Sequence, residues 1–348
     1  MKAFLKNFMC LFICAVVILC MNACGADKTA EKIKIKALII PKFEIGEMSG
    51  DDIGEAQLFY EKYCPDAEEI KLPHMPDGAQ FYINKSSGAA VLITGSGKTA
   101  CALAMTALLS NDSYDFSETY IISVGCAGGS AGLCTLGDVV FVTEACDNEL
   151  GHTADIREFE NTDAEITWFP DSSYDGFSNK LFSSSLAEKA YSMTKDIKLR
   201  STEASKNVLE KNFPNEEWAK REPKVMKGTA LSGDSFWKGE YGHKNADAVI
   251  EHFKCPDPYA VTEMEELTVA NTAECYGMLD RVISIRVVVD FDVFLGGDTP
   301  EKLWSNSEGY NNNLGAESSG AIDIFEPAMH SLFDVSSVII DAALAGKL

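Results

Sequence analysis

Acidic side chains gather at two points of the sequence where they could hold a ligand. Glu263, Glu265 and Glu266 surround a methionine at the start of a predicted helix, and Asp290 and Asp292 follow an apolar run that is predicted as a strand. Acids at the carboxyl end of a strand lie where open α/β sheets place their ligands, although a solvated loop would show the same composition. These two groups form the candidate polar centre of the protein.

The first acidic group has a structural explanation that competes with ligand binding. Thr262 and Glu265 have the spacing of a capping box, and the apolar residues Leu267, Val269 and Ala270 follow them as a helix would require. Acids in a first helical turn also interact favourably with the helix dipole. From this window alone we expect a helix cap, because such helix starts are common and binding sites are rare.

Two glycine-containing turns provide backbone groups that could contact a ligand. The turn from Gly95 through Gly97 to Lys98 joins a predicted strand to a helix, which presents N–H groups to a polar or anionic ligand. A P-loop is excluded, because Leu92 stands where that motif requires a glycine. The second turn, 125–129, has a glycine cluster that allows close approach of a ligand or simply a tight crossover.

An aromatic pair offers a surface for a flat ring. Phe236 and Trp237 stand beside Asp234 directly after a predicted strand. Aromatic side chains next to a carboxylate can stack on a heterocycle and hydrogen-bond it. Taken alone, the pair is better explained by packing in the core.

The elements that must position these residues alternate between strands and helices. Short β-branched runs bounded by glycines predict the strands, and apolar positions at helical spacing predict the helices. We expect strands at 34–40, 89–95, 119–125, 137–145, 224–232 and 281–289, and helices at 100–110, 183–198, 263–276 and 328–345. This order predicts an α/β fold, a three-layer sandwich around a mixed central β-sheet.

The amino-terminal residues resemble a targeting segment. Lys2 and Lys6 precede an apolar run, 8–20, that is too short to span a bilayer, and Ala23-Cys24 ends a stretch resembling a bacterial lipobox. Ordinary secretion with a cysteine near the cleavage site is the alternative. We expect a signal peptide at 1–23, lipid attachment at Cys24, a lipid-anchored tether at 24–34 and one domain at 35–348. The protein would be a membrane-anchored lipoprotein of the cell envelope, facing the periplasm or the exterior, with membrane contact through the anchor only.

Charge and hydropathy exclude some classes of function. The chain has 30 basic and 53 acidic residues and a formal net charge of −23. Nucleic acid is therefore not expected as a partner, because its binding depends on neutralising phosphates. The acidic balance also disfavours phosphorylated ligands. Beyond Cys24 the sequence has no apolar run long enough for a transmembrane helix.

The cysteines suggest neither a metal nor a cofactor site. Of the 11 cysteines, seven lie beyond Cys24, and no CxxC or Cys/His spacing indicates zinc. Four of them, Cys101, Cys126, Cys134 and Cys146, stand in small-residue or apolar surroundings. We expect mostly buried free thiols, no metal and no cofactor, and leave the pairing of any disulfide open.

Taken in order, the windows resemble the purine nucleoside permease family, within the nucleoside phosphorylase-like superfamily. The similar stretches are DFSETYIISVGCAGGSAGLCTLGDVVFVTEA, GDSFWKG, YAVTEMEELTVA and LDRVISIRVVVDFDVF. Each motif is weak alone, but the ordered set is specific and covers essentially the whole chain beyond the leader. The resemblance implies a nucleoside phosphorylase-like fold, a purine nucleoside ligand and a role in nucleoside uptake, for which a separate transmembrane transport partner would be needed.

The resemblance also assigns roles to individual residues. Asp290 would face the purine N7, Phe236 would stack on the base, and Glu265 would accept hydrogen bonds from the ribose hydroxyls with Met264 beside it. The pocket would further be lined by Gly95, Gly97, Lys98, Cys126, Ala127 and Gly128. Glu263 and Glu266 would remain partners of the helix dipole.

The same resemblance leaves an enzymatic function open. Asp290 would then be the general acid for cleavage of the N-glycosidic bond, and Glu44 or Glu47 would orient the attacking water. The chain has five arginines, at 157, 200, 221, 281 and 286. None of them lies in the first loop, in the Gly95 turn or before Gly125, where phosphorylases of this superfamily carry the arginines that bind phosphate. Hydrolysis is therefore favoured over phosphorolysis. Val289 precedes Asp290 where many relatives have serine, which removes a hydroxyl partner of the acid.

Overall fold

The computed structural model describes residues 31–159, 164–296, 298–299, 301 and 322–348. The expected signal peptide, the lipid attachment at Cys24 and most of the expected tether lie outside these residues. None of the helices in the described part of the chain combines the length and the apolar character that a membrane crossing requires.

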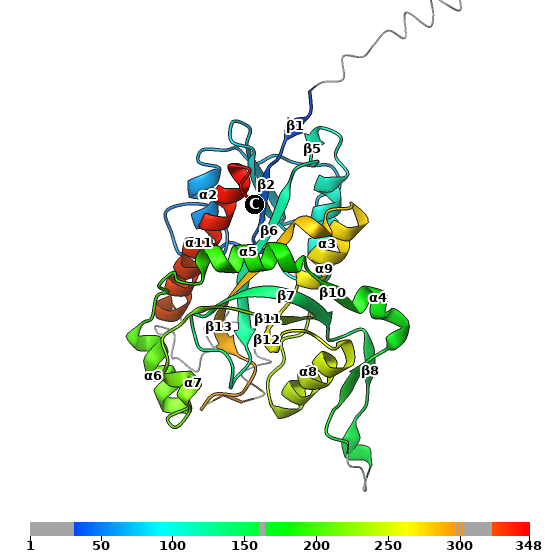
Figure 1. Ribbon diagram of the computed structural model, residues 1–348, viewed down its shortest axis with the longest axis vertical. Helices are drawn as coiled ribbons and strands as arrows, with labels where there is room; N and C mark the ends of the chain where they lie inside the picture. The colour runs from blue at the N-terminus through cyan, green and yellow to red at the C-terminus, as the bar shows by residue number, and fades with distance from the viewer. Residues whose placement is uncertain (1–30, 160–163, 297, 300, 302–321) are drawn as a thin grey trace, which may run out of the picture.

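A mixed sheet of nine strands forms the centre of the fold (Figure 1). Eight strands follow one another by hydrogen bonding, and β13 pairs with both β6 and β7. In spatial order they are β10 (Asn179–Leu181), β7 (Val139–Asp147), β11 (Val225–Ser232), β12 (Tyr259–Glu263), β6 (Tyr120–Gly129), β2 (Ala37–Ile40), β4 (Ala89–Ile93) and β3 (Gln80–Asn84), with β13 spanning Val282–Phe291. Two small sheets join β1 (Ile33–Lys34) to β5 (Tyr114–Asp115) and β8 (Gly151–Thr153) to β9 (Trp168–Pro170).

The double pairing of β13 closes part of the sheet into a ring. β13 runs parallel to β6 and antiparallel to β7. On the other side, β7 pairs with β11, β11 with β12, and β12 with β6. Residues at or just after the carboxyl ends of β6, β11, β12 and β13 line one space, together with residues that follow β2 and β4.

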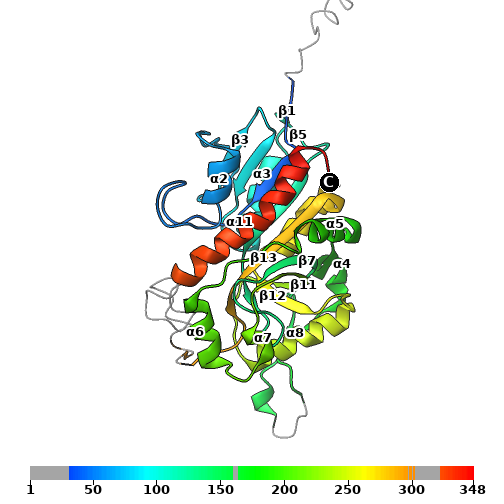
Figure 2. The same cartoon turned by 60° about the vertical axis from the view of Figure 1, so that its left-hand side comes forward.

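Helices cover both faces of the sheet. They are α2 (Gln57–Tyr63), α3 (Lys98–Leu109), α4 (Asp175–Ser178), α5 (Ser184–Thr194), α6 (Glu203–Asn212), α7 (Glu217–Lys220), α8 (Glu240–Phe253), α9 (Glu266–Cys275) and α11 (Ile322–Leu344). Figures 1 and 2 show α11 beside α2 and α5 on one side and α3 beside α9 on the other.

Alternating strand residues build two apolar cores between these layers. In β2, Leu38 and Ile40 belong to the core that contains Met105 of α3. Their neighbour Ile39 belongs to the core that contains Ile339 of α11. Because successive strand side chains point to opposite faces, a strand that is apolar at every position is buried on both sides. The predicted three-layer α/β sandwich around a mixed sheet is confirmed.

Each predicted strand and helix has a counterpart, but several boundaries differ. The predicted strand at 34–40 is split into β1 and β2, and the predicted helix at 263–276 begins only at Glu266. Glu263 instead ends β12, a strand that the sequence did not indicate. The helices α6 and α8 were also not predicted, because both are largely polar and bury few apolar residues, although those residues keep helical spacing.

Candidate functional site

A pocket of about 210 Å³ lies at the carboxyl ends of the central strands. Seven of the residues assigned from the sequence line it: Cys126, Ala127, Gly128, Phe236, Met264, Glu265 and Asp290. They come from the end of β6, the loop after β11, the loop after β12 and the end of β13. The structure therefore brings these seven residues together around one pocket.

A buried arginine contacts all three glutamates of the segment 263–266. The side chain of Arg286 in β13 is 1% exposed. Its Nε donates to Glu266 Oε1 at 2.8 Å, and its Nη2 donates to Glu263 Oε2 at 2.9 Å and lies 3.4 Å from Glu265 Oε2. Burying several carboxylates together is unfavourable unless cations compensate them. Arg286 supplies most of that compensation.

A buried lysine completes the compensation from the other side. Lys42, at the end of β2, lies with its Nζ 3.7 Å from Glu266 Oε1. The same Nζ donates to Ser123 Oγ at 2.6 Å and to the carbonyl oxygen of Ile40 at 2.8 Å. Both Lys42 and Arg286 also line the pocket. Ser123 of β6 also donates to Glu266 Oε1 at 2.7 Å, so groups from β6, from β13 and from the residues after β2 hold the glutamates in place.

The helix cap at the start of α9 is not the one that the sequence predicted. Thr262 lies within β12, and Glu265 occupies the cap position without a side-chain hydrogen bond to the helix. The cap is Glu263, whose Oε2 accepts from the backbone N–H groups of Glu265 at 2.7 Å and Glu266 at 2.8 Å. The predicted capping box is therefore wrong, because β12 continues one residue past Thr262.

Glu265 is consequently available to the pocket. Its Oε1 accepts from the backbone N–H of Gly97 at 2.7 Å, and its side chain is almost fully buried. Burial raises the pKa of Glu265 to about 7, while Arg286 and Lys42 oppose that rise. A carboxylate fixed in this way can accept hydrogen bonds from ligand hydroxyl groups.

The first loop contributes a different carboxylate from the one expected. Glu44 does not line the pocket; its carboxylate accepts backbone N–H groups of its own loop, including those of Gly54 and Ala56. The carboxylate that reaches the pocket is Glu55, which accepts from the backbone N–H of Lys42 at 2.8 Å and of Cys126 at 2.7 Å. Glu47 is exposed. Of the predicted candidates and their neighbours in this loop, Glu55 and not Glu44 therefore lines the pocket.

The turn from Gly95 to Lys98 contributes only one of its four residues to the pocket lining. Ser96 lines the pocket, but Gly95, Gly97 and Lys98 do not. The Nζ of Lys98 pairs with Glu149 at 2.7 Å and with Asp147 at 3.2 Å. The N–H of Gly97 is used by Glu265. This turn therefore fixes the position of Glu265 and does not itself form an anion site.

Asp290 enters the pocket at an irregularity of β13. The register between β13 and β6 shifts between Val288 and Asp290, and Asp290 then pairs with Gly128. A Cβ at Gly128 would lie 3.0 Å from Asp290 Oδ1, so glycine leaves room for the carboxylate. Burial raises the pKa of Asp290, and Lys238, with its Nζ 3.2 Å from Oδ2, opposes that rise.

Asp292, the second acid after this strand, has a structural role. Its carboxylate accepts the backbone N–H of Ala131 at 3.1 Å and contacts His243 Nδ1 at 2.8 Å. Asp292 is not among the lining residues.

The aromatic residues form the outer part of the pocket. Phe236 and Trp237 both line it, and Phe236 is 52% exposed. A half-exposed ring at the edge of a pocket can be covered by a flat ligand. Trp237 additionally packs near Tyr259, with ring centroids 6.3 Å apart.

Sequence reasoning missed four charged residues of the site: Lys42, Glu55, Lys238 and Arg286. One of them carried a signal, because an arginine at the centre of the apolar strand 281–289 is expected to pair with buried acids. The others stand in loops or at strand ends, where charged residues are ordinary. Their positions follow from the closure of the strand ring.

Comparison with known proteins identifies a family and relatives that match more than half of the chain. The family model described as purine nucleoside permease matches residues 34–346. A probable purine nucleoside permease of Schizosaccharomyces pombe is 25% identical over 260 residues, which cover 68% of this chain and 74% of that protein. A purine nucleoside permease of Candida albicans is 25% identical over 218 residues, which cover 58% of this chain and 53% of that protein.

Solved structures share the fold at lower identity. The 5′-methylthioadenosine/S-adenosyl homocysteine nucleosidase of Helicobacter pylori is 16% identical, with a TM-score of 0.52 and coverage of 89% of this chain and 99% of that chain. The corresponding protein of Campylobacter jejuni is 15% identical, with a TM-score of 0.52 and coverage of 90% and 100%. These structural similarities show a nucleoside phosphorylase-like fold, and at 15% to 16% identity they show the fold alone.

Proposed function

This chain belongs to the purine nucleoside permease family, and we propose that it binds a purine nucleoside in the pocket between β6, β11, β12 and β13. The observation that carries the proposal is the position of Glu265, which Gly97 and Arg286 hold at the wall of a pocket that also contains Phe236 and Asp290. These groups suit the two halves of a nucleoside, a hydroxyl-rich sugar and a flat base.

The ribose is held by the acidic side of the pocket. Glu265 accepts hydrogen bonds from ribose hydroxyls, and the apolar side chain of Met264 lies beside it in the lining. A hydrogen bond to a charged group contributes about 1.5–3 kcal/mol, compared with about 1 kcal/mol for a neutral one. The carboxylate therefore provides most of the sugar affinity.

The base is held by the opposite side. Phe236 stacks on it, and Asp290 faces its N7, to which the protonated carboxyl group donates. The raised pKa of Asp290 favours this protonated form. A pyrimidine nucleoside has no N7, so the contact favours purines.

The electrostatic balance of the pocket argues against a bound phosphate. Two cations, Lys42 and Arg286, face four carboxylates, namely Glu55, Glu263, Glu265 and Glu266. Lys238, beside Asp290, adds a third cation, so the carboxylates still outnumber the cations when Asp290 is protonated. An anionic co-ligand would meet uncompensated negative charge, whereas a neutral nucleoside would not.

Binding serves nucleoside uptake in this proposal. The protein is held at the cell envelope through lipid on Cys24 and delivers nucleoside to a separate transmembrane partner. The test is accumulation of radiolabelled adenosine, inosine and uridine by cells with and without the protein. The proposal predicts that loss of the protein reduces accumulation of both purine nucleosides and leaves uridine unchanged. Equal purine accumulation in both strains would refute the role in uptake.

Cleavage of the nucleoside is a second candidate, favoured by one observation. The pocket contains an acid with a raised pKa, Asp290, and a second buried carboxylate, Glu55, which comes from the first loop. Asp290 would protonate N7 as the bond between C1′ and N9 breaks. Water would add its oxygen to C1′ and lose a proton to Glu55, which gives free purine and ribose.

Product analysis separates cleavage from binding. Purified protein is incubated with adenosine, inosine or guanosine, with and without phosphate, and the products are resolved by chromatography. Release of base that needs no phosphate and is lost in Asp290→Asn would establish hydrolysis. Ribose 1-phosphate formed only with phosphate would establish phosphorolysis and contradict the electrostatic argument above.

A further inference from the structure

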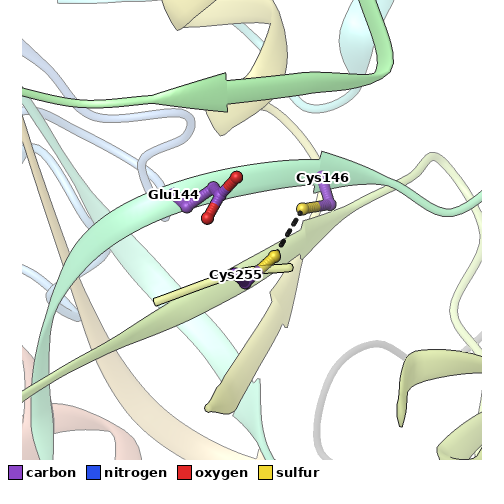
Figure 3. Close-up of side chains that lie close together, drawn as sticks. All are labelled: Glu144, Cys146 and Cys255. Atoms are coloured by element: carbon purple, nitrogen blue, oxygen red, sulfur yellow. Dashed lines mark hydrogen bonds between the residues drawn. The ribbon is translucent and has the colours of Figure 1, made fainter. Parts of the chain in front are cut away.

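We propose that Glu144, Cys146 and Cys255 form a binding site for a zinc-class divalent cation, outside the nucleoside pocket. The three side chains offer one carboxylate oxygen and two sulfur atoms that all lie within 4.8 Å of one another. Figure 3 shows the two sulfur atoms facing each other, with the carboxylate of Glu144 beside them.

The spacing of the sulfur atoms fits coordination to one metal ion. The Sγ atoms of Cys146 and Cys255 are 3.6 Å apart. Two thiolates bound tetrahedrally to zinc, each with a bond of about 2.3 Å, place their sulfur atoms about 3.8 Å apart. The existing positions therefore need a change of only a few tenths of an ångström.

The carboxylate of Glu144 has an unmet requirement that a cation would satisfy. Glu144 is buried, and its Oε2 has no hydrogen-bond partner among the described residues. Its Oε1 accepts from Asn179 Nδ2, which is a neutral donor. No lysine, arginine or histidine of the described chain lies within 4.0 Å of this carboxylate. A buried carboxylate without a cationic partner is costly, and a divalent ion would supply the missing charge.

The ligand set selects the class of metal. Two thiolates and one carboxylate suit zinc or a similar borderline-soft ion, not magnesium or calcium, which prefer oxygen ligands. Three protein ligands leave one tetrahedral position for water. Coordination replaces the thiol protons: each cysteine loses its proton to solvent as its sulfur binds the cation, so two protons are released for each ion.

A bound ion would link the residues after α8 to β7 of the central sheet. Glu144 and Cys146 stand two residues apart on β7, and Cys255 follows the end of α8. Cys146 packs in an apolar cluster with Leu231 and Val249, which also includes the pocket residue Trp237. The ion would therefore stabilise the support of one pocket wall without touching the nucleoside. This inference stands on its own geometry and does not depend on the proposed function.

The test is metal binding by the full-length protein, kept reduced and freed of metal. Titration with Co²⁺ should produce a thiolate-to-cobalt charge-transfer band and the visible bands of tetrahedral cobalt. Elemental analysis after loading with Zn²⁺ should give one ion per chain. Zinc should also raise the temperature of unfolding, because it binds the native state.

Matched variants identify the ligands. Cys255→Ser changes a partly exposed side chain and should weaken zinc binding at least a hundredfold and abolish the charge-transfer band, whereas Cys275→Ser, at an exposed cysteine away from the cluster, should behave as the parent. Glu144→Gln keeps both thiols and should weaken binding about tenfold or more. Circular dichroism establishes that each variant is folded.

Two results would overturn the proposal. The first is equal stoichiometry and affinity for zinc in the parent and in folded Cys255→Ser. The second is a disulfide between Cys146 and Cys255, found by mass spectrometry of peptides from protein isolated without air.

Discussion

Glu263, Glu265 and Glu266 lie close together in the sequence and all contact Arg286, but each has a different structural role. Glu263 caps α9, Glu266 is buried against Arg286 and Lys42, and Glu265 remains at the pocket wall. Sequence spacing alone could not separate these roles, because each of the three acids is compatible with a first helical turn. Because Arg286 contacts all three, the distinction depends on their other partners: helix N–H groups for Glu263, the N–H of Gly97 for Glu265 and Lys42 for Glu266.

Substitution of Glu265 by glutamine tests its role in sugar binding. The amide oxygen can still accept the N–H of Gly97, and Arg286 keeps Glu263 and Glu266, so the free energy of unfolding should fall by about 1 kcal/mol or less. Nucleoside affinity should weaken about tenfold, which corresponds to about 1.4 kcal/mol, because the ribose loses a charged acceptor. Isothermal titration calorimetry and urea unfolding measure the two quantities.

The control for this variant lies on the same helix. Glu274→Gln changes an acid of α9 whose side chain is 52% exposed and that pairs with Lys180 at the surface. It should leave nucleoside affinity unchanged. If Glu265→Gln binds nucleoside as tightly as Glu274→Gln, the proposed sugar contact is wrong.

The raised pKa of Glu265 predicts a pH dependence of binding. The pKa is about 7 in the free protein, and ribose hydroxyls require the charged carboxylate. Affinity should therefore fall as pH decreases through this pKa, by about tenfold per pH unit below it. Because Glu263 and Glu266 share Arg286 with Glu265, the observed pKa belongs to the cluster.

The measurement is the dissociation constant across the range from about pH 5.5 to 8.5. The parent should show the decrease in affinity at low pH, and Glu265→Gln should lose most of it. A parent protein whose affinity is the same across this range would contradict the assignment of Glu265.

At the scale of single elements, the start of α9 shows what sequence patterns can and cannot give. The helix itself was predicted, since Leu267, Val269 and Ala270 mark its buried face. Its first residue was not, because β12 runs through Glu263 and removes Thr262 from the cap. Tertiary pairing of β12 with β6 and β11 overrides the local capping signal.

This difference predicts that two neighbouring substitutions lower the free energy of unfolding by different amounts. Glu263→Ala removes the acceptor for two N–H groups and a buried partner of Arg286, and should cost about 3 kcal/mol or more of stability. Thr262→Ala should cost less than about 1 kcal/mol, because its hydroxyl does not cap the helix. Urea unfolding with a shared slope gives both values. A larger loss for Thr262→Ala would restore the capping box.

The first loop shows a second limit at this scale. Two of its acids, Glu44 and Glu55, stand on either side of a turn, and both are buried or partly buried. Only contacts with a distant strand decide which one reaches the pocket: Glu55 meets the N–H of Cys126 in β6, whereas Glu44 stays within its own loop. The sequence gives no indication of that pairing.

At the scale of the whole molecule, the sequence predicted the architecture well. Apolar strands with glycine boundaries predicted the layers, and seven of the 19 residues that line the pocket were assigned to it from the ordered motifs. The ring closed by β13 was not predictable, because a strand that pairs with β6 and β7 looks like any other buried strand. For the same reason the cluster of Glu144, Cys146 and Cys255 has no sequence signature, since its ligands come from two distant segments.

Attachment to the membrane is a prediction for the chain as a whole. Cys24 ends a stretch that resembles a lipobox, so the parent protein should fractionate with membranes. Cys24→Ser should release it, because the mature chain would lack its lipid. Immunoblotting of membrane and soluble fractions measures the distribution, and Cys275→Ser serves as the control that should remain attached. A Cys24→Ser protein that stays with the membranes would rule out the lipid anchor.

Calorimetric titration of the purified protein with nucleosides tests directly whether the pocket binds a purine nucleoside. Adenosine, inosine and guanosine are titrated in buffer without phosphate and then with phosphate added, and uridine and cytidine serve as controls. The account predicts saturable binding of at least one purine nucleoside, an affinity unchanged by phosphate, and pyrimidine binding at least tenfold weaker. Absence of binding by all three purine nucleosides, or binding that requires phosphate, would contradict it.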